Sequence, residues 1–314
     1  MLFSAKLKTK YFWYKINMNP PIMIIDDSLD SILQSIESAK SKSRTSFPTK
    51  QIFIVSWNVN LLKKAASRDQ FHQFISEKSP DILCFEETKI TLSEQNRFKS
   101  LFPQYSYQYW SFSEELDHWA GLALLSKAEA HSIYHGIGTL NSTGRVLSVE
   151  FEDFFICVCY CPLSKSEEEQ QKRAIWDEEL RHFIIELQKR KNVIWIGDFN
   201  IIHTEDDIIG LPSDLIVPPG FGIIERKSFE KNFELGFVDS FRYCNGDEKK
   251  FSWRSIRMPG CPLGRIWKSR IDYALVSVRM LPYLKESIIF DDYKAVSDHC
   301  PIGVKFDFSV NENI

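Results

Sequence analysis

The sequence lacks the features that mark several classes of protein. Its net charge is only −3, so no overall charge indicates a polyanionic partner, and any nucleic-acid surface must be a local patch. No apolar run approaches the roughly 18 to 20 residues that a membrane span needs, and we expect no membrane partner. The seven cysteines form no C-x-x-C pair, and those of "FFICVCYCP" alternate as small apolar side chains on one strand face. We therefore expect a reducing compartment.

The chain nevertheless has enough apolar residues for a large core. Of its 314 residues 44% are hydrophobic and 14% aromatic, which predicts a globular protein. The first 25 residues carry four lysines and no acid, which is compatible with a flexible basic arm or a mitochondrial transit peptide. A short amphipathic helix is predicted near 29–36, and a linker follows. We expect an N-terminal extension over 1–47, one folded domain over 48–308 and a tail over 309–314.

Hydrophobic periodicity predicts an α/β protein in which strands and helices alternate. Apolar runs predict strands at 51–57, 81–85, 121–126, 145–151, 154–160, 192–199, 237–241, 270–277 and 301–308. Helical spacing predicts helices at 68–78, 166–191 and 224–235. Some strands follow one another after short turns and others follow helices, so both antiparallel and parallel pairs are expected. The pattern favours two mixed sheets packed face to face with helices outside.

Polar side chains gather where five of these strands end or begin. In α/β sheets, functional groups collect at strand ends because loops there can be polar while the strands hold them rigid. Any one of these groups has a structural explanation as a turn cap or an ion pair, but five separate caps are a poor explanation of the whole set. The residues are Asn58, Asn60, Glu86, Glu87, Tyr160, Asp198, Asn200, Asp298 and His299.

These residue types match the requirements of phosphodiester hydrolysis. Magnesium takes oxygen ligands, of which Glu87 and Asp298 are candidates. Asp198 suits the group that takes a proton from water. Donors for the charge that develops on the phosphate are Asn200, Tyr160 and a protonated His299, which the carboxylate of Asp272 would orient.

The chain also resembles a known family over about residues 51–308. The motifs "WNVN", "DILCFEETK", "GLALLSK", "GRVLSVEF", "YCP", "GDFNIIH", "FVDSFR", "SRIDY" and "SDHCPI", in this order, resemble the exonuclease III and AP endonuclease branch of the endonuclease/exonuclease/phosphatase superfamily. The resemblance implies a four-layered α/β sandwich and a magnesium-dependent phosphodiesterase that cuts DNA on the 5′ side of abasic sites, with manganese as the alternative ion. It implies a metal pocket formed by Asn58, Glu87, Asp198, Asn200, Asp298 and His299, and catalytic roles for Tyr160, Asp198, Asn200, Asp272 and His299.

Four positions depart from the pattern of that family. Glu86 stands where the family usually has Gln, which would add a negative charge beside the metal ligand. Leu61 replaces the usual Gly, and Leu163 replaces an amide residue whose phosphate contact Ser164 is expected to supply or leave missing. Ser269 stands where the abasic-sugar pocket usually has a bulky residue. The loop "TEDDIIGLPSDLIVPPG" also lacks the Asn and Lys residues that bind DNA in animal relatives.

Basic and aromatic residues near the C-terminal third suggest a DNA-contacting surface. Arg254, Arg257, Trp267, Lys268 and Arg270 lie in "FSWRSIRMPGCPLGRIWKSR", and this mixture suits phosphate contact combined with stacking at a gap in a duplex. The alternative is a solvated loop with loosely packed tryptophans. Lys63, Lys64 and Arg68 are further candidates for phosphate contacts.

The leading hypothesis is a monomeric AP endonuclease of base-excision repair. Its partner would be double-stranded DNA with abasic or 3′-blocked sites, and 3′-5′ exonuclease or 3′-phosphodiesterase activity would accompany incision. A second hypothesis keeps the fold for a retroelement-type endonuclease or an RNA 3′-end nuclease. A third makes the chain a non-catalytic nucleic-acid-binding protein, although no catalytic carboxylate or histidine is missing. We expect a nuclear location, with the mitochondrion as the alternative that the basic arm allows.

Overall fold

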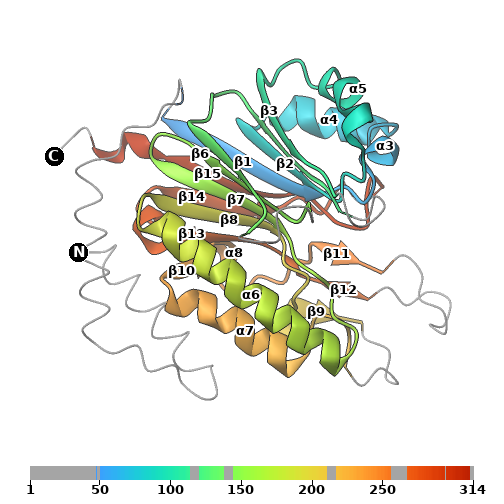
Figure 1. Cartoon of the computed structure of the whole chain (residues 1–314), viewed down its shortest axis with the longest axis vertical. Coiled ribbons are helices and arrows are strands. Elements are labelled where there is room, and N and C mark those ends of the chain that lie inside the picture. Colours follow the sequence, from blue (N-terminus) through green and yellow to red (C-terminus); the bar gives the residue numbers. More distant parts are fainter. Residues whose placement is uncertain are drawn as a thin grey trace.

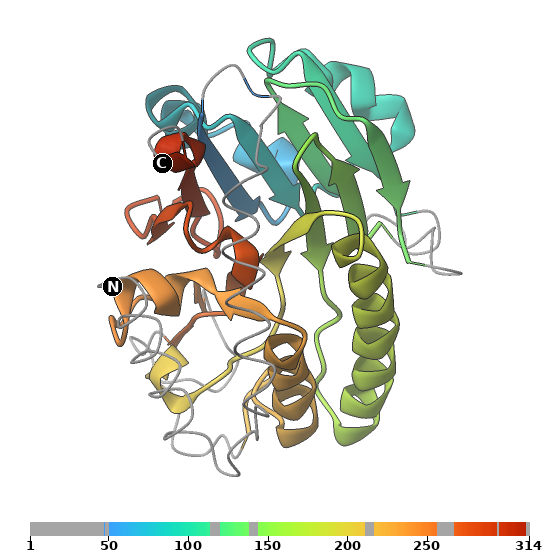
Figure 2. The same cartoon turned by 90° about the vertical axis from the view of Figure 1, so that its left-hand side faces the viewer.

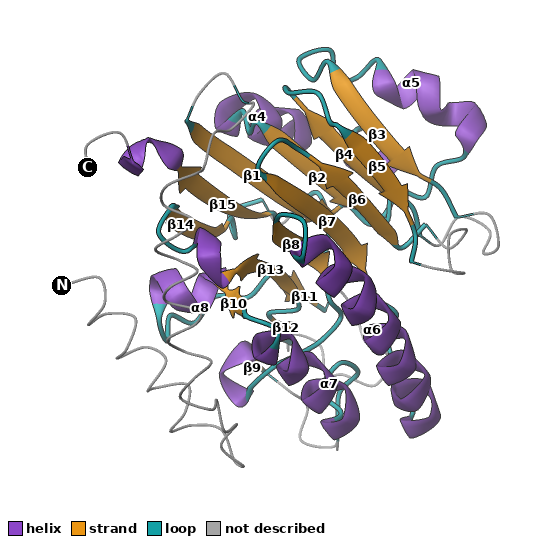
Figure 3. Cartoon of the chain, turned by 60° about the vertical axis from the view of Figure 1, so that its left-hand side comes forward, coloured by secondary structure: helices purple, strands orange, loops and turns teal. Residues whose placement is uncertain are grey.

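The computed structural model describes residues 47, 50–113, 120–137, 144–210, 217–255, 267–293 and 295–311. Two six-stranded mixed sheets form its centre (Figure 3). In spatial order, the first sheet contains β14 (Leu284–Ile289), β15 (Ile302–Asp307), β1 (Gln51–Asn58), β2 (Ile82–Glu86), β4 (Leu122–Ser126) and β3 (Tyr107–Ser111). The second contains β10 (Phe237–Asp239), β13 (Asp272–Ser277), β8 (Asn192–Asp198), β7 (Phe154–Tyr160), β6 (Val146–Glu150) and β5 (Ser132–His135).

Helices cover the outer faces of both sheets. The helices α3 (Leu62–Ala65), α4 (Asp69–Lys78) and α5 (Gln95–Lys99) lie on the side of the first sheet, and α6 (Glu167–Gln188) and α7 (Ile223–Glu234) lie on the opposite side (Figure 1). The turned view shows the same separation of the cyan helices from α6 and α7 (Figure 2). The helix α8 (Ser240–Asn245) follows β10, and a small third sheet contains β11 (Trp253–Arg254), β12 (Lys268–Ser269) and β9 (Ile208–Ile209). The expected four-layered α/β sandwich is confirmed.

The layers follow from the two-residue period of the strands. Ile54 of β1 and Ile156 of β7 belong to the core between the sheets, whereas their neighbours point outward. Val55 packs with the aromatic residues of α4, and Cys157 packs against α6 in a separate apolar cluster. Burial on both faces explains why these strands read as continuous apolar runs.

The helices form where their sequences provide caps and apolar faces. Ser166 caps α6, because its hydroxyl accepts a 3.2 Å hydrogen bond from the backbone N–H of Glu169. Phe71, Phe74 and Ile75 of α4 are buried, as the helical spacing predicts. No helix in the described ranges is long and apolar enough to cross a membrane.

Several elements differ from the sequence prediction. The strands β3, β5 and β14 and the third sheet were not predicted, and α6 ends at Gln188 rather than at 191. The helix expected near 29–36 lies outside the described residues. Phe47, which we placed in the N-terminal extension, packs on Phe151 and Phe154 with ring centroids 5.3 and 6.1 Å apart, so this residue belongs to the core.

Strand register brings the polar strand ends together. Asn58 pairs with Glu86 in the parallel pair β1–β2, and Tyr160 pairs with Asp198 in the parallel pair β7–β8. The close approach of β8 to β7 requires glycine at 197, where a Cβ atom would lie 2.1 Å from the carbonyl oxygen of Cys159. The carboxyl ends of both parallel pairs therefore face each other at one end of the sandwich.

Candidate active site and metal pocket

Asn58 connects the two sheets at this end of the sandwich. Its side-chain Nδ2 donates one 2.9 Å hydrogen bond to Glu87 Oε1 and another to Asp198 Oδ2, and the residue is fully buried. Its Oδ1 accepts a 3.0 Å bond from the backbone N–H of Asn60. The side chain therefore lies in the predicted metal pocket and presents amide N–H groups to its two carboxylates.

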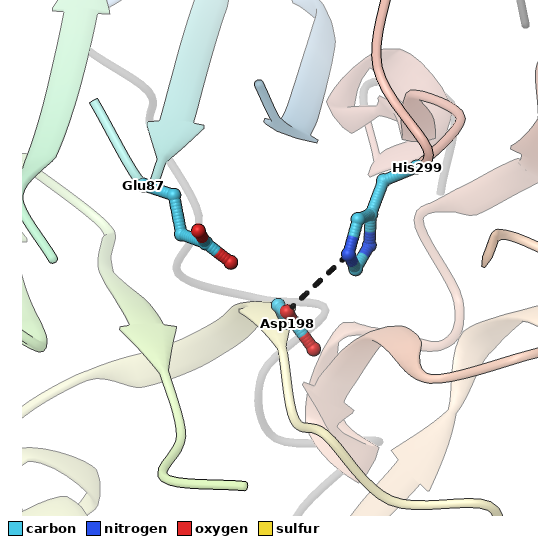
Figure 4. A group of neighbouring side chains, drawn as sticks. All are labelled: Glu87, Asp198 and His299. Atoms are coloured by element: carbon cyan, nitrogen blue, oxygen red, sulfur yellow. Dashed lines mark ion pairs between the residues drawn. The ribbon is translucent and has the colours of Figure 1, made fainter. Parts of the chain in front are cut away.

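His299 lies between two carboxylates of the second sheet. Its Nδ1 is 2.9 Å from Asp272 Oδ2, and its Nε2 is 3.8 Å from Asp198 Oδ2 (Figure 4). Burial alone would lower the pKa of His299, but the charges of Asp272 and Asp198 outweigh it and raise the pKa well above its usual value. The raised pKa favours the imidazolium form, whose Nδ1 donates to Asp272 while Nε2 lies at ion-pair distance from Asp198. Asp272 is therefore placed to orient the ring, the role that we predicted for it.

Asp198 is the carboxylate best placed to take a proton. It is 1% exposed, and its Oδ1 accepts a 2.8 Å bond from the backbone N–H of Asn200. Burial raises the pKa of Asp198 to about 7, against the lowering effect of the His299 charge. A carboxylate with a pKa near neutrality suits general-base work.

Tyr160 and Asn200 lie beside Asp198 on neighbouring strand ends. Burial and the charges of Glu87 and Asp198 raise the pKa of Tyr160, so its phenol stays protonated and can donate. Asn200 donates from Nδ2 to the carbonyl of Cys161 at 2.9 Å. The structure thus brings these predicted catalytic side chains together.

The donor set fits a divalent cation. Glu87, Asp198 and His299 each have a nitrogen or carboxylate oxygen within 4.8 Å of the others (Figure 4). The two carboxylates can bind a divalent cation, whereas His299 in its imidazolium form has no free lone pair for the metal-ligand role that we predicted for it. Carboxylate oxygens are the ligands that magnesium and manganese prefer. Asp298, another predicted ligand, accepts from Asn60 Nδ2 at 2.9 Å and from the Trp253 indole at 3.1 Å. These two neutral donors set the orientation of its carboxylate.

Lys89 is a member of the site that sequence reasoning missed. Its Nζ lies 2.6 Å from Glu87 Oε2 and 2.8 Å from Asn60 Oδ1. The ammonium group thus balances the negative charge of Glu87. The motif "EETK" contained the signal, because a lysine two residues after a half-buried acid can reach back to it when the backbone turns.

The backbone makes such turns at several residues of the site. Non-glycine residues with positive φ include Asn60 (44°), Leu61 (103°), Glu87 (51°), Lys89 (51°) and Asn200 (49°). Such conformations cost about 1 to 2 kcal/mol each for residues that carry a Cβ atom. Leu61, at a position where we expected glycine in relatives, therefore adopts a conformation that glycine adopts without strain.

Glu86 corrects one of our expectations. We expected a negative charge beside the metal ligand, but the residue is fully buried and accepts a short hydrogen bond from the Ser56 hydroxyl. Burial raises the pKa of Glu86 well above its usual value, and Asp272 and Asp198 raise it further, against the opposing effect of Ser56. This environment favours the protonated, neutral form of Glu86, which has nearly the shape of the glutamine that we expected in relatives at this position.

Of the predicted DNA-binding residues that the structure describes, two are half-exposed and two are buried. Arg254 and Lys268 are half-exposed in the third sheet, and Arg257 lies outside the described residues. Trp267 is 5% exposed in an apolar cluster and contacts the Trp253 ring at 5.2 Å, so its ring is covered. This packing disagrees with the stacking role that we predicted for Trp267.

Arg270 is also not a DNA contact, because its guanidinium is buried. It donates from Nε to Asp207 Oδ1 at 2.8 Å and from Nη1 to Asp239 Oδ2 at 2.7 Å, and it is 1% exposed. Its Cζ lies 4.5 Å from the centre of the Tyr273 ring. Arg270 thus links Asp207, which precedes β9 of the third sheet, to Asp239 of β10 in the second sheet.

Two other departures from the family pattern are also clear. The Ser164 hydroxyl donates to Glu225 Oε2 at 2.6 Å and is buried, so it does not supply the phosphate contact that an amide side chain at position 163 would make. Leu163 is 42% exposed. Ser269 is 1% exposed and therefore offers no bulky surface to a sugar.

One end of the two-sheet sandwich carries a carboxylate pair, an Asp–His pair and amide donors. This combination is typical of hydrolases of phosphodiester bonds, and comparison with known proteins supports the same class. Residues 55–299 match the Endonuclease/Exonuclease/phosphatase family, and the chain belongs to this family.

Individual relatives cover most of the chain. An exodeoxyribonuclease of Bacillus subtilis is 35% identical over 253 residues, which cover 79% of this chain and 97% of the relative. A DNA-(apurinic or apyrimidinic site) endonuclease of Dictyostelium discoideum is 34% identical, over 82% of this chain and 72% of the relative. Among solved structures, a 3′ phosphatase from Neisseria bound to a product DNA hairpin has the same fold, with a TM-score of 0.71, 23% identity and coverage of 82% of this chain and 99% of that chain.

Replacing Glu86 by Gln is expected to change the pH dependence of stability. The native Glu86 stays protonated while the unfolded chain loses this proton above about pH 4.5, so the stability that protonation contributes declines as pH rises toward the raised native pKa. Glu86→Gln lacks this decline, so its free energy of unfolding should rise relative to that of the wild type by up to about 1.4 kcal/mol per pH unit. Urea unfolding between pH 5 and 8 in EDTA measures this difference, with the exposed Glu179→Gln as control. If the wild type and Glu86→Gln show the same pH dependence of stability, Glu86 does not have a raised pKa in the folded protein.

Replacing Arg270 by Met should destabilise the fold strongly. The change leaves Asp239 buried without its counter-ion and Asp207 with Arg242 alone, which costs about 3 to 5 kcal/mol. Thermal and urea unfolding at pH 7 provide the measurement. The half-exposed neighbour Lys268→Met is the matched control and should change the free energy of unfolding by less than about 1 kcal/mol. Equal effects of the two substitutions would argue against a buried ion-pair role for Arg270.

Proposed function

We propose that the protein is a magnesium-dependent DNA-(apurinic or apyrimidinic site) endonuclease that cuts double-stranded DNA on the 5′ side of abasic sites. The observation that carries the proposal is the arrangement of Asp198 between the Asn58 amide and the His299 imidazolium. In this arrangement Asp198 can take a proton from water, and the neighbouring His299 can donate to the phosphate. The names of the relatives support a DNA substrate.

The residues divide the chemistry among them. Asp198 takes the proton of the attacking water, a P–O bond forms, and the bond to the 3′-oxygen breaks. The departing 3′-oxygen takes a proton from water, which leaves a 3′-hydroxyl and a 5′-phosphate. Tyr160, Asn200 and His299 donate to the phosphate oxygens, whose charge grows during the attack. A magnesium ion, held chiefly by Glu87, would add positive charge to the same oxygens.

Exposed cations beside the site support binding of a nucleic-acid backbone. Lys63 and Lys64 of α3 and the following Arg68 are exposed, and α3 begins only four residues after Asn58. Such side chains bind phosphates without reading base sequence. Activity on 3′-blocked ends belongs to the proposal as well, and a DNA substrate favours a nuclear or mitochondrial location.

The direct test is incision of a duplex that contains one tetrahydrofuran abasic analogue. We expect cleavage 5′ of the analogue with magnesium or manganese and none in EDTA, and a loss of at least about 1000-fold in Asp198→Asn at an unchanged melting temperature. The undamaged duplex is the substrate control. No incision of the abasic duplex at any divalent-metal concentration would refute the proposed function, and preferential cleavage of a 3′-phosphate end or single-stranded RNA would reassign the substrate.

The pH profile is expected to have two limbs. At saturating magnesium, kcat/KM should rise with pH as Asp198 loses its proton and fall again when His299 loses its own. Asp272→Asn removes a charge that raises the pKa of His299, so the alkaline limb should move to lower pH. Steady-state rates between pH 5 and 10 measure this shift. An alkaline limb that stays in place in Asp272→Asn would show that His299 is not the group involved.

A further inference from the structure

Arg173 of α6 is a buried cation with no part in the chemistry described above. Its side chain is 4% exposed, and its Nε donates to Asp177 Oδ1 one helical turn away at 2.7 Å. Asp177 in turn accepts a 2.9 Å bond from the Ser228 hydroxyl of α7. A buried arginine needs such a partner, but the ion pair uses only one of its nitrogens.

The other two nitrogens of Arg173 bind backbone carbonyls of the two catalytic loops. Nη1 donates to the carbonyl of Pro162, two residues after Tyr160. Nη2 donates at 2.7 Å to the carbonyl of Phe199, which lies between Asp198 and Asn200. One rigid guanidinium thus spans the segments that carry the phenol, the base and the amide.

The same two segments are joined directly on the side of the site. The backbone N–H of Cys161 donates to the Asp198 carbonyl at 2.8 Å, and Asn200 Nδ2 donates to the Cys161 carbonyl. These bonds set the loops relative to each other. Arg173 adds the bonds that hold both loops against the helix layer behind the second sheet.

We propose that Arg173 is a positioning residue for phosphodiester cleavage, which holds Tyr160 and Asn200 at their distance from the scissile phosphate. The inference rests on the proposed function and assigns a role to a residue outside the site. Catalytic rates respond to displacements of about 1 Å, so loosening of these two loops should reduce turnover before it reduces substrate binding.

The chain offers a matched control on the same helix. Arg181 is also 4% exposed on its side chain, but it donates to Glu178 and to the Ser228 carbonyl of α7, and none of its bonds reaches a catalytic loop. A lysine at either position keeps the charge but lacks the planar fork that spans several acceptors. Arg173→Lys therefore removes hydrogen bonds to the two catalytic loops, whereas Arg181→Lys removes hydrogen bonds to Glu178 and α7.

The experiment compares both variants on the abasic duplex with magnesium. For Arg173→Lys we expect a loss of about 10- to 100-fold in kcat with KM within about threefold. For Arg181→Lys we expect kcat within about threefold of the wild type. Equal kcat losses in the two variants, or an unchanged kcat in Arg173→Lys, would overturn the proposal. If Arg173→Lys does not fold, Asp177→Asn takes its place, with an expected kcat loss of several-fold and the same criteria.

A second measurement does not depend on activity. Amide hydrogen exchange of Cys161 and Asn200, whose N–H groups both donate to Asp198, should become faster in Arg173→Lys and not in Arg181→Lys. Faster exchange in a protein whose wild type does not cut the abasic duplex would mean that Arg173 positions these loops for another reaction. Unchanged exchange in both variants would reject the role of Arg173 even if the proposed function holds.

Discussion

One amide group holds the acidic site together. Glu87 follows β2 of the first sheet and Asp198 ends β8 of the second, and a half-buried and a buried carboxylate repel each other unless donors lie between them. Asn58 provides both donors from a single nitrogen, and it can do so because it is the last residue of β1, at the end of the sandwich where the parallel pairs of both sheets finish. With Asp198 placed in this way, the His299 imidazolium lies beside it, and Asp272 lies behind the imidazole. The site is thus a consequence of packing the two sheets in this register.

Most of the architecture follows from the pattern of apolar residues. The strands buried on both faces, such as β1, β2 and β8, contain runs of four or five consecutive apolar or small residues, which predict buried strands. The missed strands have weaker patterns for physical reasons. The edge strand β5 reads SIYH and is only half-buried, and β14 reads LKESII, in which two exposed charged residues break the apolar run. The strands of the third sheet have two residues each, which is too short for any periodicity.

A site residue could be predicted where the chemistry of one reaction restricts the residue type. It could not be predicted where a partner far away in the sequence determines the role of the residue. Asp198, His299 and Asp272 were identified because an acid, a histidine and a second acid at strand ends suit one reaction. Arg270 was misassigned because an arginine among tryptophans resembles a DNA contact, and only the fold shows Asp207 and Asp239 opposite it. The charge state of Glu86 likewise depends on burial between the sheets, which no local pattern shows. Sequence reasoning therefore grouped residues that the fold brings together, but it did not find the network of side chains around them.

The order of the elements along the chain has a consequence for synthesis. The first and last strands of the domain, β1 and β15, are hydrogen-bonded neighbours, and His299 lies just before β15. A growing chain that has reached β13 already contains Glu87, Asp198 and Asp272, but β1 still lacks its partner on one side and the imidazole has not been made. Under the proposed function, such a chain lacks one of the residues of its site. The site is therefore complete only when the last strand of the domain, β15, pairs with the first.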